Sequence, residues 1–326
     1  MEIIGESLDE ILIDSYQAIR ERGARNEGST RGDNTELLGV LLRMKHPRAR
    51  LSRSADRGLP FTALGEFLWY LAGSDDPGFI LPYISAYAAE VTDEGIVNGA
   101  YGPRLLSSYG LNQVTAVIDI LRRKPASRRA VIQIYAASDL LIEKEVPCTT
   151  TLQFFVRSER LQAIASLRSN DAYLGLPHDA FCFTMLQEMI ARSLGVEVGE
   201  YIQLVGSFHL YDKHEKRAER YIQEGHHRLA EMPAMPPGDA FEVVPIILGH
   251  ESRIRTGDRI DPDLPGVDPY WADLIRLIQV HFASDDSEYL DALSASFADP
   301  MYRMYLDDRR GRQPPSCIGA VERTDR

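Results

Sequence analysis

Cysteine is scarce in this chain and is not arranged for cross-linking. Three cysteines occur among the 326 residues, Cys148, Cys182 and Cys317, and no pair has the CxxC spacing. A sparse, odd set of this kind predicts neither a disulfide framework nor a zinc site, and we expect no bound metal. It fits a reducing compartment, so we expect a cytoplasmic protein.

Basic charge and long apolar runs are lacking as well. The chain has 36 Lys and Arg against 48 Asp and Glu, a net charge of −12. Because nucleic acid backbones attract a basic face, this balance argues against DNA or RNA as a partner, although a few arginines suffice for a small phosphorylated substrate. No apolar run approaches membrane-spanning length, and the N-terminus lacks a basic region followed by an apolar one. We therefore expect neither membrane insertion nor a signal peptide.

Hydrophobic periodicity predicts a mixed chain with one sizeable core. We expect helices over 7–22, 64–71, 111–123, 183–194, 212–224, 273–283 and 287–297, and strands over 37–44, 130–135, 151–156, 161–167 and 201–208. A hairpin turn is expected at 157–160, a loop over 25–35, strand and loop excursions over 232–265, and a mobile polar tail over 309–326. The mixture predicts an α+β fold with helices packed on one face of a sheet.

One short stretch gathers groups that suit attack on an electron-poor ring carrying a phosphate. Cys148 follows Pro147, which fixes the backbone ahead of it, and the anion-binding pair Arg168 and Ser169 comes some twenty residues later. Taken alone, Cys148 is equally well interpreted as a small buried hydrophobe, but the positive charge of Arg168 favours a reactive thiolate. The other two cysteines are interpreted as a core residue and an incidental residue of the tail.

Separated motifs carry a family resemblance. They are Glu66-Phe67-Leu68-Trp69-Tyr70-Leu71, Tyr101-Gly102, Ser127-Arg128-Arg129, Pro147-Cys148, Gln153-Phe154, Arg168-Ser169-Asn170-Asp171, Leu174-Gly175-Leu176-Pro177 and Gly206-Ser207-Phe208-His209-Leu210-Tyr211. With these motifs in this order, the chain resembles thymidylate synthases over roughly residues 60 to 215. The resemblance implies a mixed β-sheet covered by helices, in a homodimer packed through the sheets. It also implies one catalytic domain over 1–326, with a divergent part from about residue 215.

The resemblance assigns the central chemistry to Cys148, Glu66 and Tyr101. It implies that Cys148 adds to C6 of a pyrimidine nucleotide, so that C5 becomes nucleophilic and takes a one-carbon unit from 5,10-methylenetetrahydrofolate. Glu66 is expected to organise water and proton transfers. The alternative for Glu66 is a helix carboxylate in a salt bridge, which is less favoured because the surrounding segment is strongly apolar.

The resemblance also implies the contacts of the two small molecules. Nucleotide contacts are expected from Arg31, Arg128, Arg129, Arg168, Ser169, Asp179, His209 and Tyr211, and folate contacts from Asp171, Leu174, Gly175 and Tyr87. His209 and Tyr211 are implied to bind the sugar hydroxyl. Arg25 is an alternative to Arg31, because the spacing of this loop departs from that of the family. Arg128 and Arg129 suit a solvated turn by themselves, whereas the family implies that they reach the partner's phosphate across a homodimer.

Asp179 is a departure from the family that bears on the choice of base. Thymidylate synthases carry asparagine here, and that amide accepts from N3–H of uracil and donates to O4. A carboxylate accepts from the amino group of cytosine, and also from N3 once that nitrogen is protonated, which drains charge as Cys148 attacks. Asp179 therefore predicts cytosine, as in the cytidylate hydroxymethylases of the family. The alternative is a surface aspartate that caps a helix beginning near residue 181.

Tryptophan is the second departure, with only Trp69 and Trp271 present. Synthases place tryptophans shortly before the Tyr-Gly motif, where they shield the exocyclic methylene during hydride transfer, and this segment has Tyr83 and Tyr87 instead. Without the indoles, water is expected to add to the exocyclic methylene, which leaves CH2OH on the ring in place of CH3. Tetrahydrofolate is then released without being oxidised. Thr149 also stands where synthases have histidine.

These observations predict a cytidylate 5-hydroxymethylase acting on CMP or dCMP. Relatives that act on ribonucleotides serve nucleoside antibiotic pathways, and the length of this chain favours CMP over the dCMP of compact phage enzymes. One alternative is a thymidylate synthase that methylates dUMP. Another is a non-catalytic regulator that binds nucleotides or RNA on the same scaffold, which the intact Cys148, Glu66 and Arg168 argue against.

Overall fold

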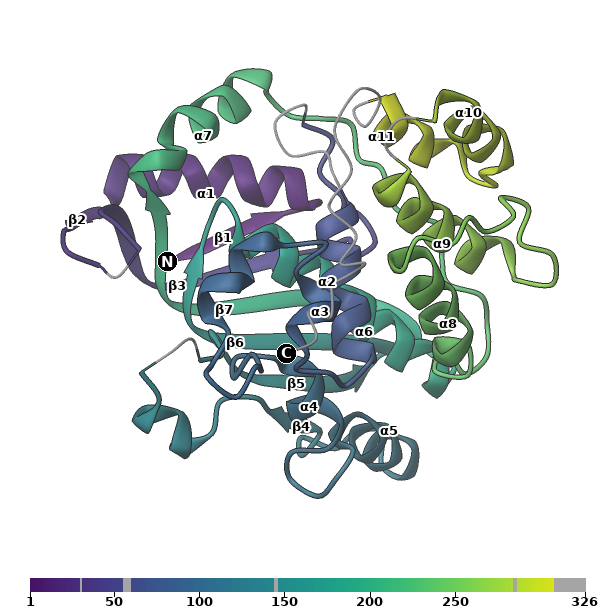
Figure 1. Cartoon of the computed structure of the whole chain (residues 1–326). Helices are drawn as coiled ribbons and strands as arrows, with labels where there is room; N and C mark the ends of the chain where they lie inside the picture. Colours follow the sequence, from purple (N-terminus) through teal and green to yellow (C-terminus); the bar gives the residue numbers. More distant parts are fainter. Residues whose placement is uncertain (30, 55–59, 144–145, 284–285, 308–326) are drawn as a thin grey trace, which may run out of the picture.

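A mixed β-sheet forms the centre of the molecule (Figure 1). The computed structural model describes residues 1–29, 31–54, 60–143, 146–283 and 286–307. Within these residues the sheet has seven strands in the order β1-β3-β7-β6-β5-β4, with β2 paired to β3. β1 is parallel to β3 and β6 to β7, and the other pairs are antiparallel. The strands are β1 Glu2–Gly5, β2 Ala24–Asn26, β3 Asn34–Met44, β4 Val131–Gln133, β5 Thr149–Arg157, β6 Arg160–Asp171 and β7 Glu197–Tyr211.

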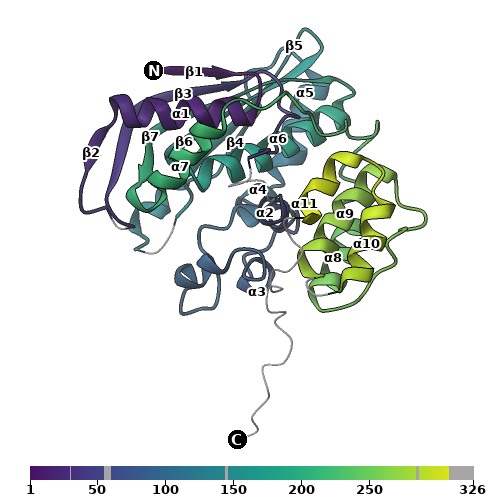
Figure 2. The same cartoon turned by 90° about the horizontal axis from the view of Figure 1, so that it is seen from above.

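Helices cover one face of this sheet. Figure 2 shows β1, β3 and β5 at one edge of the molecule, with helices such as α2, α6 and α9 on one side of these strands. They are α1 Leu8–Arg22, α2 Phe61–Leu71, α3 Pro77–Ile80, α4 Tyr101–Leu106, α5 Gln113–Arg123, α6 Gly175–Leu194, α7 Asp212–Glu224, α8 Val244–Arg255, α9 Pro269–Phe282, α10 Ser287–Ser296 and α11 Met304–Asp307. Short 3-10 turns are η1 Ser85–Glu90, η2 Ala137–Leu141 and η3 Pro300–Arg303. The expected α+β fold with a helix-covered mixed sheet is confirmed.

Alternation along the strands explains why one face is covered. In β3, the side chains of Val40, Leu42 and Met44 are buried, whereas those of Leu41 and Arg43 between them are only partly buried. This period of two is what a strand with one buried face requires. The hairpin expected between β5 and β6 is confirmed, because Ser158 and Glu159 both have positive φ, as a two-residue type I′ turn demands.

The start of α6 differs from the expectation. The helix was expected to begin at residue 183, and it begins at Gly175 and ends before Gly195, whose φ is +68°. Pro177 is compatible with the first turn, where its missing N–H costs no helical hydrogen bond. The helix runs through the centre of the core, with Leu176 and Phe181 both buried, so its apolar residues do not form the one-sided stripe that marks a surface helix.

Two further expectations were wrong. Residues 232–265 were expected to contain only strands and loops, yet α8 lies there, with Ile247, Glu251 and Ile254 on its buried side. A buried carboxylate on that face breaks the apolar pattern that would have indicated a helix. Residues 25–35 were expected to be a loop, yet β2 forms by pairing with β3. The tail 309–326, with Cys317, lies outside the described residues. In the described part of the chain, no helix combines the length and apolarity needed to cross a bilayer.

A fully buried ion pair links α6 to the chain before α2. Arg50 donates to Glu188, and neither side chain is exposed to solvent. The other carboxylate oxygen of Glu188 accepts from the backbone N–H of Met235 at 2.9 Å. Removing one partner of such a pair leaves a buried charge without compensation, which is strongly destabilising.

We therefore expect Glu188→Ala to lower the free energy of unfolding by about 3–5 kcal/mol. Urea unfolding followed by circular dichroism measures this change. The double variant with Arg50→Met and Glu188→Met is the control, because it removes both charges and conserves volume, and we expect it to be more stable than Glu188→Ala. Equal destabilisation by both proteins would contradict the assignment of the loss to an unpaired charge.

Candidate active site

Cys148 lies at the start of β5, beside Arg168 of β6. The backbone N–H of Arg168 donates to the carbonyl of Cys148 at 2.8 Å. The guanidinium donates through Nε to the carbonyl of Pro147 at 3.0 Å and through Nη2 to that of Val146 at 3.0 Å. Arg168 therefore holds the loop that carries the thiol and brings its positive charge next to that loop, as the sequence predicted.

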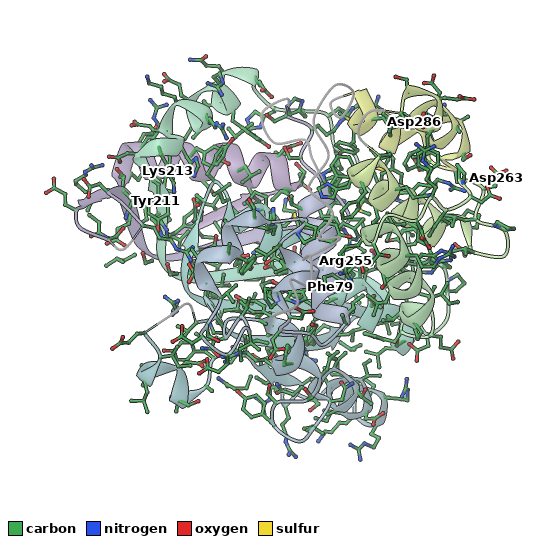
Figure 3. All side chains as sticks on the ribbon, in the orientation of Figure 1. Phe79, Tyr211, Lys213, Arg255, Asp263 and Asp286 are labelled. Carbon is green, nitrogen blue, oxygen red and sulfur yellow. The ribbon has the colours of Figure 1, made fainter. Side chains whose placement is uncertain are left out.

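The parallel pairing of β6 and β7 aligns the predicted phosphate, sugar and folate residues. Ser169 lies beside Ser207, and Asp171 beside His209, in register. Tyr211 ends β7, its ring at 4.8 Å from that of His209, and Figure 3 shows it next to Lys213, whose Nζ lies 5.2 Å from the Tyr211 ring. Burial lowers the pKa of His209, which favours a neutral imidazole able to donate and accept.

Glu66 of α2 is the centre of a buried cluster. Its Oε1 accepts hydrogen bonds from the hydroxyl groups of Tyr87 at 2.9 Å and Tyr70 at 3.3 Å. Its Oε2 lies 2.7 Å from Nδ1 of His178 in α6. Burial and the charge of Glu66 raise the pKa values of both tyrosines well above the usual value, so both remain donors. The carboxylate is thus held by two phenols and an imidazole, and it forms an ion pair only when His178 is protonated.

Asp179 lies inside α6 and is the fifth residue of that helix. The alternative of a helix-capping aspartate is therefore wrong, because the helix begins at Gly175. Its Oδ2 accepts a hydrogen bond of 2.6 Å from Nδ2 of Asn170, at the end of β6. Burial, together with the charge of Glu66, raises the pKa of Asp179 well above its usual value, and the Asn170 contact opposes this only in part. Asp179 is thus a carboxyl that holds its proton more tightly than a solvated one.

Tyr101, at the start of α4, anchors the residue that follows the thiol. Its hydroxyl donates to Oγ1 of Thr149 at 3.1 Å and accepts from the Thr149 N–H at 3.1 Å. Its ring stacks on Tyr70 at 5.0 Å and on Phe183 at 6.2 Å. Burial and the nearby Asp179 and Cys148 raise its pKa well above the usual value. The cluster around Glu66 and the loop of Cys148 are therefore joined through stacked aromatic rings.

The family of this chain follows from comparison with models of known protein families. The thymidylate synthase family model matches residues 11–241, more than half of the chain. The chain belongs to the thymidylate synthase family. Members of this family transfer a one-carbon unit from methylenetetrahydrofolate to a pyrimidine nucleotide, and the chain is a transferase of that class. The match extends beyond the motif resemblance on both sides and ends before α8.

The arginines of this thymidylate synthase family member differ in their surroundings. Arg25 is engaged by Asp212, with Nη2 at 2.6 Å from Oδ2. Arg31 donates to Glu90 of η1 at 2.9 Å, and its charge acts on both His209 and Tyr211. Arg31 is therefore the better placed of the two alternatives for a ligand of the nucleotide.

Arg128 and Arg129 lie on an exposed loop before β4. The carbonyl of Arg128 accepts from Nε2 of Gln153 at 3.0 Å, and the N–H of Arg129 donates to Oγ of Ser127 at 3.2 Å. These backbone contacts fix the loop and leave both side chains exposed. Their reach to the phosphate of a partner remains a prediction.

Tyr83 and Tyr87, the two tyrosines expected in place of the synthases' tryptophans, have separate surroundings. Tyr87 belongs to the Glu66 cluster, and its ring meets Trp69 edge-on at 5.3 Å. Tyr83 instead donates to Glu251 of α8 at 2.9 Å and stacks on His281 of α9 at 5.1 Å. Its ring also lies so close to α2 that a Cβ at Gly65 would come within 2.2 Å. Only Tyr87 therefore faces the cluster.

The helices beyond the family match support this segment from outside. Arg255 of α8 lies over the ring of Phe79 in α3 at 4.7 Å, as Figure 3 shows. The same arginine pairs with Glu251, the partner of Tyr83, at 2.8 Å. The segment between α2 and α4, which carries Tyr87, is thus held in place by contacts with residues that lie outside the family resemblance.

The predicted folate residues present a surface that fits a flat ring with N–H donors. Asp171 is partly buried at the end of β6, and its Oδ1 accepts from the N–H of Tyr173 at 2.8 Å. Leu174 is 46% exposed although it is apolar. Gly175 allows close approach, because a Cβ there would lie 3.0 Å from Oδ1 of Asn170. A carboxylate beside an exposed apolar side chain suits a pterin.

Two residues in this site had no role in the sequence reasoning, namely His178 and Asn170. Asn170 lies inside a motif that carries the family resemblance, and His178 lies directly before Asp179, but neither was assigned a function. Asn170 contacts Asp179, and His178 contacts Glu66, across 9 and 112 residues of sequence respectively. A polar residue next to apolar residues that become buried, as His178 is in its helix, is the sequence signal that would have suggested a buried partner.

Proposed function

We propose that the chain is a cytidylate 5-hydroxymethylase. It converts CMP or dCMP, with methylenetetrahydrofolate and water, into the 5-hydroxymethyl nucleotide and tetrahydrofolate. The observation that supports this most strongly is Asp179, a carboxyl with a raised pKa that is held by Asn170.

The protonation of Asp179 explains why cytosine suits the site. As a neutral acid, Asp179 offers one donor and one acceptor, which complement N3 and the amino group of cytosine but also the edge of uracil. After the proton moves to N3, both edge positions of cytosine donate to the carboxylate. Uracil loses the match in that state, because its O4 then faces a negative charge without a donor. Cytosine is thus paired in both protonation states, and uracil in one.

The residues of the chain then act in sequence on the nucleotide. Cys148 Sγ bonds to C6, and the electron pair of C5=C6 moves to C5 while Asp179 supplies a proton to N3. The bound folate supplies one carbon at the oxidation level of formaldehyde and departs as tetrahydrofolate, and C5 gives up its hydrogen as a proton to solvent. Once C5 carries an exocyclic methylene, water oxygen bonds to that carbon and Glu66 takes the water proton. The Cys148–C6 bond breaks, its electron pair goes to sulfur, and no hydride is transferred.

Other residues are assigned to binding. Arg168, Ser169 and Arg31 bind the phosphate, while His209 and Tyr211 bind the sugar hydroxyl. For the residues of β6 and β7 this assignment is supported by the alignment of the two strand ends. For Arg31 it is supported by the effect of its charge on His209 and Tyr211. Folate is assigned to the surface formed by Asp171, Leu174, Gly175 and Tyr87.

A homodimer packed through the sheets is part of the proposal. The face of the sheet opposite the helices carries Leu38, 74% exposed, and Leu204, 39% exposed. Leu204 also lines a hollow, together with residues that include Gly39 and Gly206. Apolar side chains on an uncovered sheet favour burial against a second sheet. In such a dimer Arg128 and Arg129 serve the phosphate site of the partner.

Incubation of the protein with CMP, dCMP and dUMP in turn, each with methylenetetrahydrofolate, tests the proposal. We expect CMP or dCMP to gain the mass of one CH2O, without the absorbance change that accompanies dihydrofolate formation. Turnover of dUMP alone, with dihydrofolate released, would identify a thymidylate synthase instead. Nucleotide binding without any turnover would identify a regulator.

A further inference from the structure

We infer that His178 is a positioning residue that orients the Glu66 carboxylate for the water-adding step. This inference deepens the proposed function and rests on it. Glu66 touches the reacting water in that scheme, and His178 acts only through Glu66.

The first argument is geometric. Nδ1 of His178 lies 2.7 Å from Oε2 of Glu66, and Nε2 lies 3.1 Å from Oγ1 of Thr62. Thr62 and Glu66 are four residues apart on α2, so they project from one face of that helix. One helix thus engages both nitrogens of a side chain that comes from another helix. The imidazole plane and the Glu66 carboxylate are fixed relative to each other.

The second argument concerns protonation. A threonine hydroxyl both donates and accepts. When His178 is neutral, Nδ1–H donates to Glu66 and Nε2 accepts from Thr62. When His178 is protonated, Nε2–H donates to Thr62 instead. The same geometry therefore serves both states of the imidazole, and Glu66 keeps its donor in each.

The third argument is the charge around the pair. The titratable groups that face it are Tyr70, Tyr87, Asp179 and Cys182, all of which are less readily ionised than in water. The charge of Glu66 contributes to the raised pKa of Asp179. A second anion in this space is therefore costly unless a donor or cation offsets it. His178, adjacent to Asp179 in α6, supplies that offset to Glu66 while Asp179 keeps its proton.

The step in which His178 assists is balanced. Water oxygen forms a bond to the exocyclic methylene, and the water proton passes to the Glu66 carboxylate. The electron pair returns through the ring to form C5=C6, and it expels Cys148 as a thiolate. The proton on Glu66 is then returned to that thiolate or to solvent. His178 donates to Oε2 throughout and neither gains nor loses a bond to carbon.

Two variants of His178 test the inference. His178→Phe removes both hydrogen bonds and retains a ring, and we expect the kcat for hydroxymethyl formation to fall about 10- to 100-fold, less than the loss of a general base itself. The KM for the cytidylate should change less than about threefold, because His178 acts on proton transfer and not on binding. His178→Asn retains a donor near the place of Nδ1–H, and we expect it to recover most of kcat. Equal losses of kcat in both variants, or a rise in KM that matches the loss of kcat, would overturn the inference.

A partial reaction separates this role from a merely structural one. Exchange of the hydrogen at C5 of the nucleotide requires Cys148 but precedes the addition of water. We expect His178→Phe to retain exchange while hydroxymethyl formation falls, and equal losses of both would overturn the inference. His250→Phe, on α8 and outside the cluster, is the matched control, and thermal unfolding of each variant checks its folding.

The same experiments distinguish the inference from the proposed function. Wild-type protein that methylates dUMP and leaves cytidylates unchanged disproves the hydroxymethylase. In that event the inference fails with respect to water addition, but the kcat of His178→Phe compared with that of His178→Asn on dUMP still reports whether the hydrogen bond from His178 orients Glu66. Wild-type hydroxymethylation with an unaffected His178→Phe variant overturns the inference alone.

Discussion

Replacement of Cys148 by serine is expected to abolish turnover of cytidylates. The thiolate forms the only covalent bond between protein and substrate in the proposed scheme. A serine hydroxyl is ionised far less readily than a thiol, so we expect kcat/KM to fall by about 10⁴-fold or more. Initial rates with CMP and dCMP measure the loss. Binding of the nucleotide, measured by calorimetry, should remain, because Arg168 and the strand residues proposed to bind the nucleotide are unchanged.

The matched control for this experiment is Cys182→Ala. Cys182 is buried in α6 and donates to the carbonyl of Ala63 at 3.6 Å, so we expect this variant to keep activity within a few-fold of wild type. The assignment of the nucleophile is wrong if Cys182→Ala loses turnover while Cys148→Ser retains it.

Asp179→Asn is expected to invert the base preference. The amide has no proton to supply to N3 of cytosine, so charge that develops when Cys148 attacks is no longer drained. We expect kcat/KM for cytidylates to fall about 10²- to 10³-fold, and the value for dUMP relative to CMP to rise. Rates with CMP, dCMP and dUMP for both proteins decide this. Retained cytidylate turnover, within a few-fold, would show that Asp179 does not read the base.

Asp179→Asn also has a signature in stability, with a sign that follows from the raised pKa. A carboxyl that binds its proton more tightly in the folded protein than in the unfolded chain stabilises the fold at low pH. That stabilisation is lost as the pH rises from the pKa of Asp179 in the unfolded chain toward its raised pKa in the folded protein. We therefore expect wild-type stability, relative to Asp179→Asn, to decline over this range in urea unfolding. An unchanged difference between pH 4 and pH 8 would contradict the burial of this carboxyl.

The local chemistry of the site was accessible from the sequence. The thiol of Cys148, its arginine neighbour and the aspartate at 179 are identified by residue type and by their order along one stretch. The amphipathic helix at 212–224 and the hairpin at 157–160 were also predicted correctly, because spacing and turn residues act over a few positions. In α8 the same reasoning failed, since Glu251 lies on the buried face and interrupts the apolar period.

Contacts between residues that are far apart in the sequence depend on tertiary packing and cannot be predicted from local patterns. Glu66 and His178 are 112 residues apart, and Tyr83 and Glu251 are 168 apart, so no spacing in the chain links them. They meet because α2 packs against α6 and α8 packs near the segment after α2. The raised pKa of Asp179 has the same origin, since it depends on burial and on the charge of Glu66 from another helix.

The amino-acid sequence by itself determined which reactive groups this protein carries and the order in which they follow one another. The tertiary structure alone decided which of them share a cluster, which carboxyl holds its proton, and which tyrosine faces Glu66. The physical reason is that side-chain chemistry is a property of each residue, whereas proximity and desolvation arise only when distant segments are buried together.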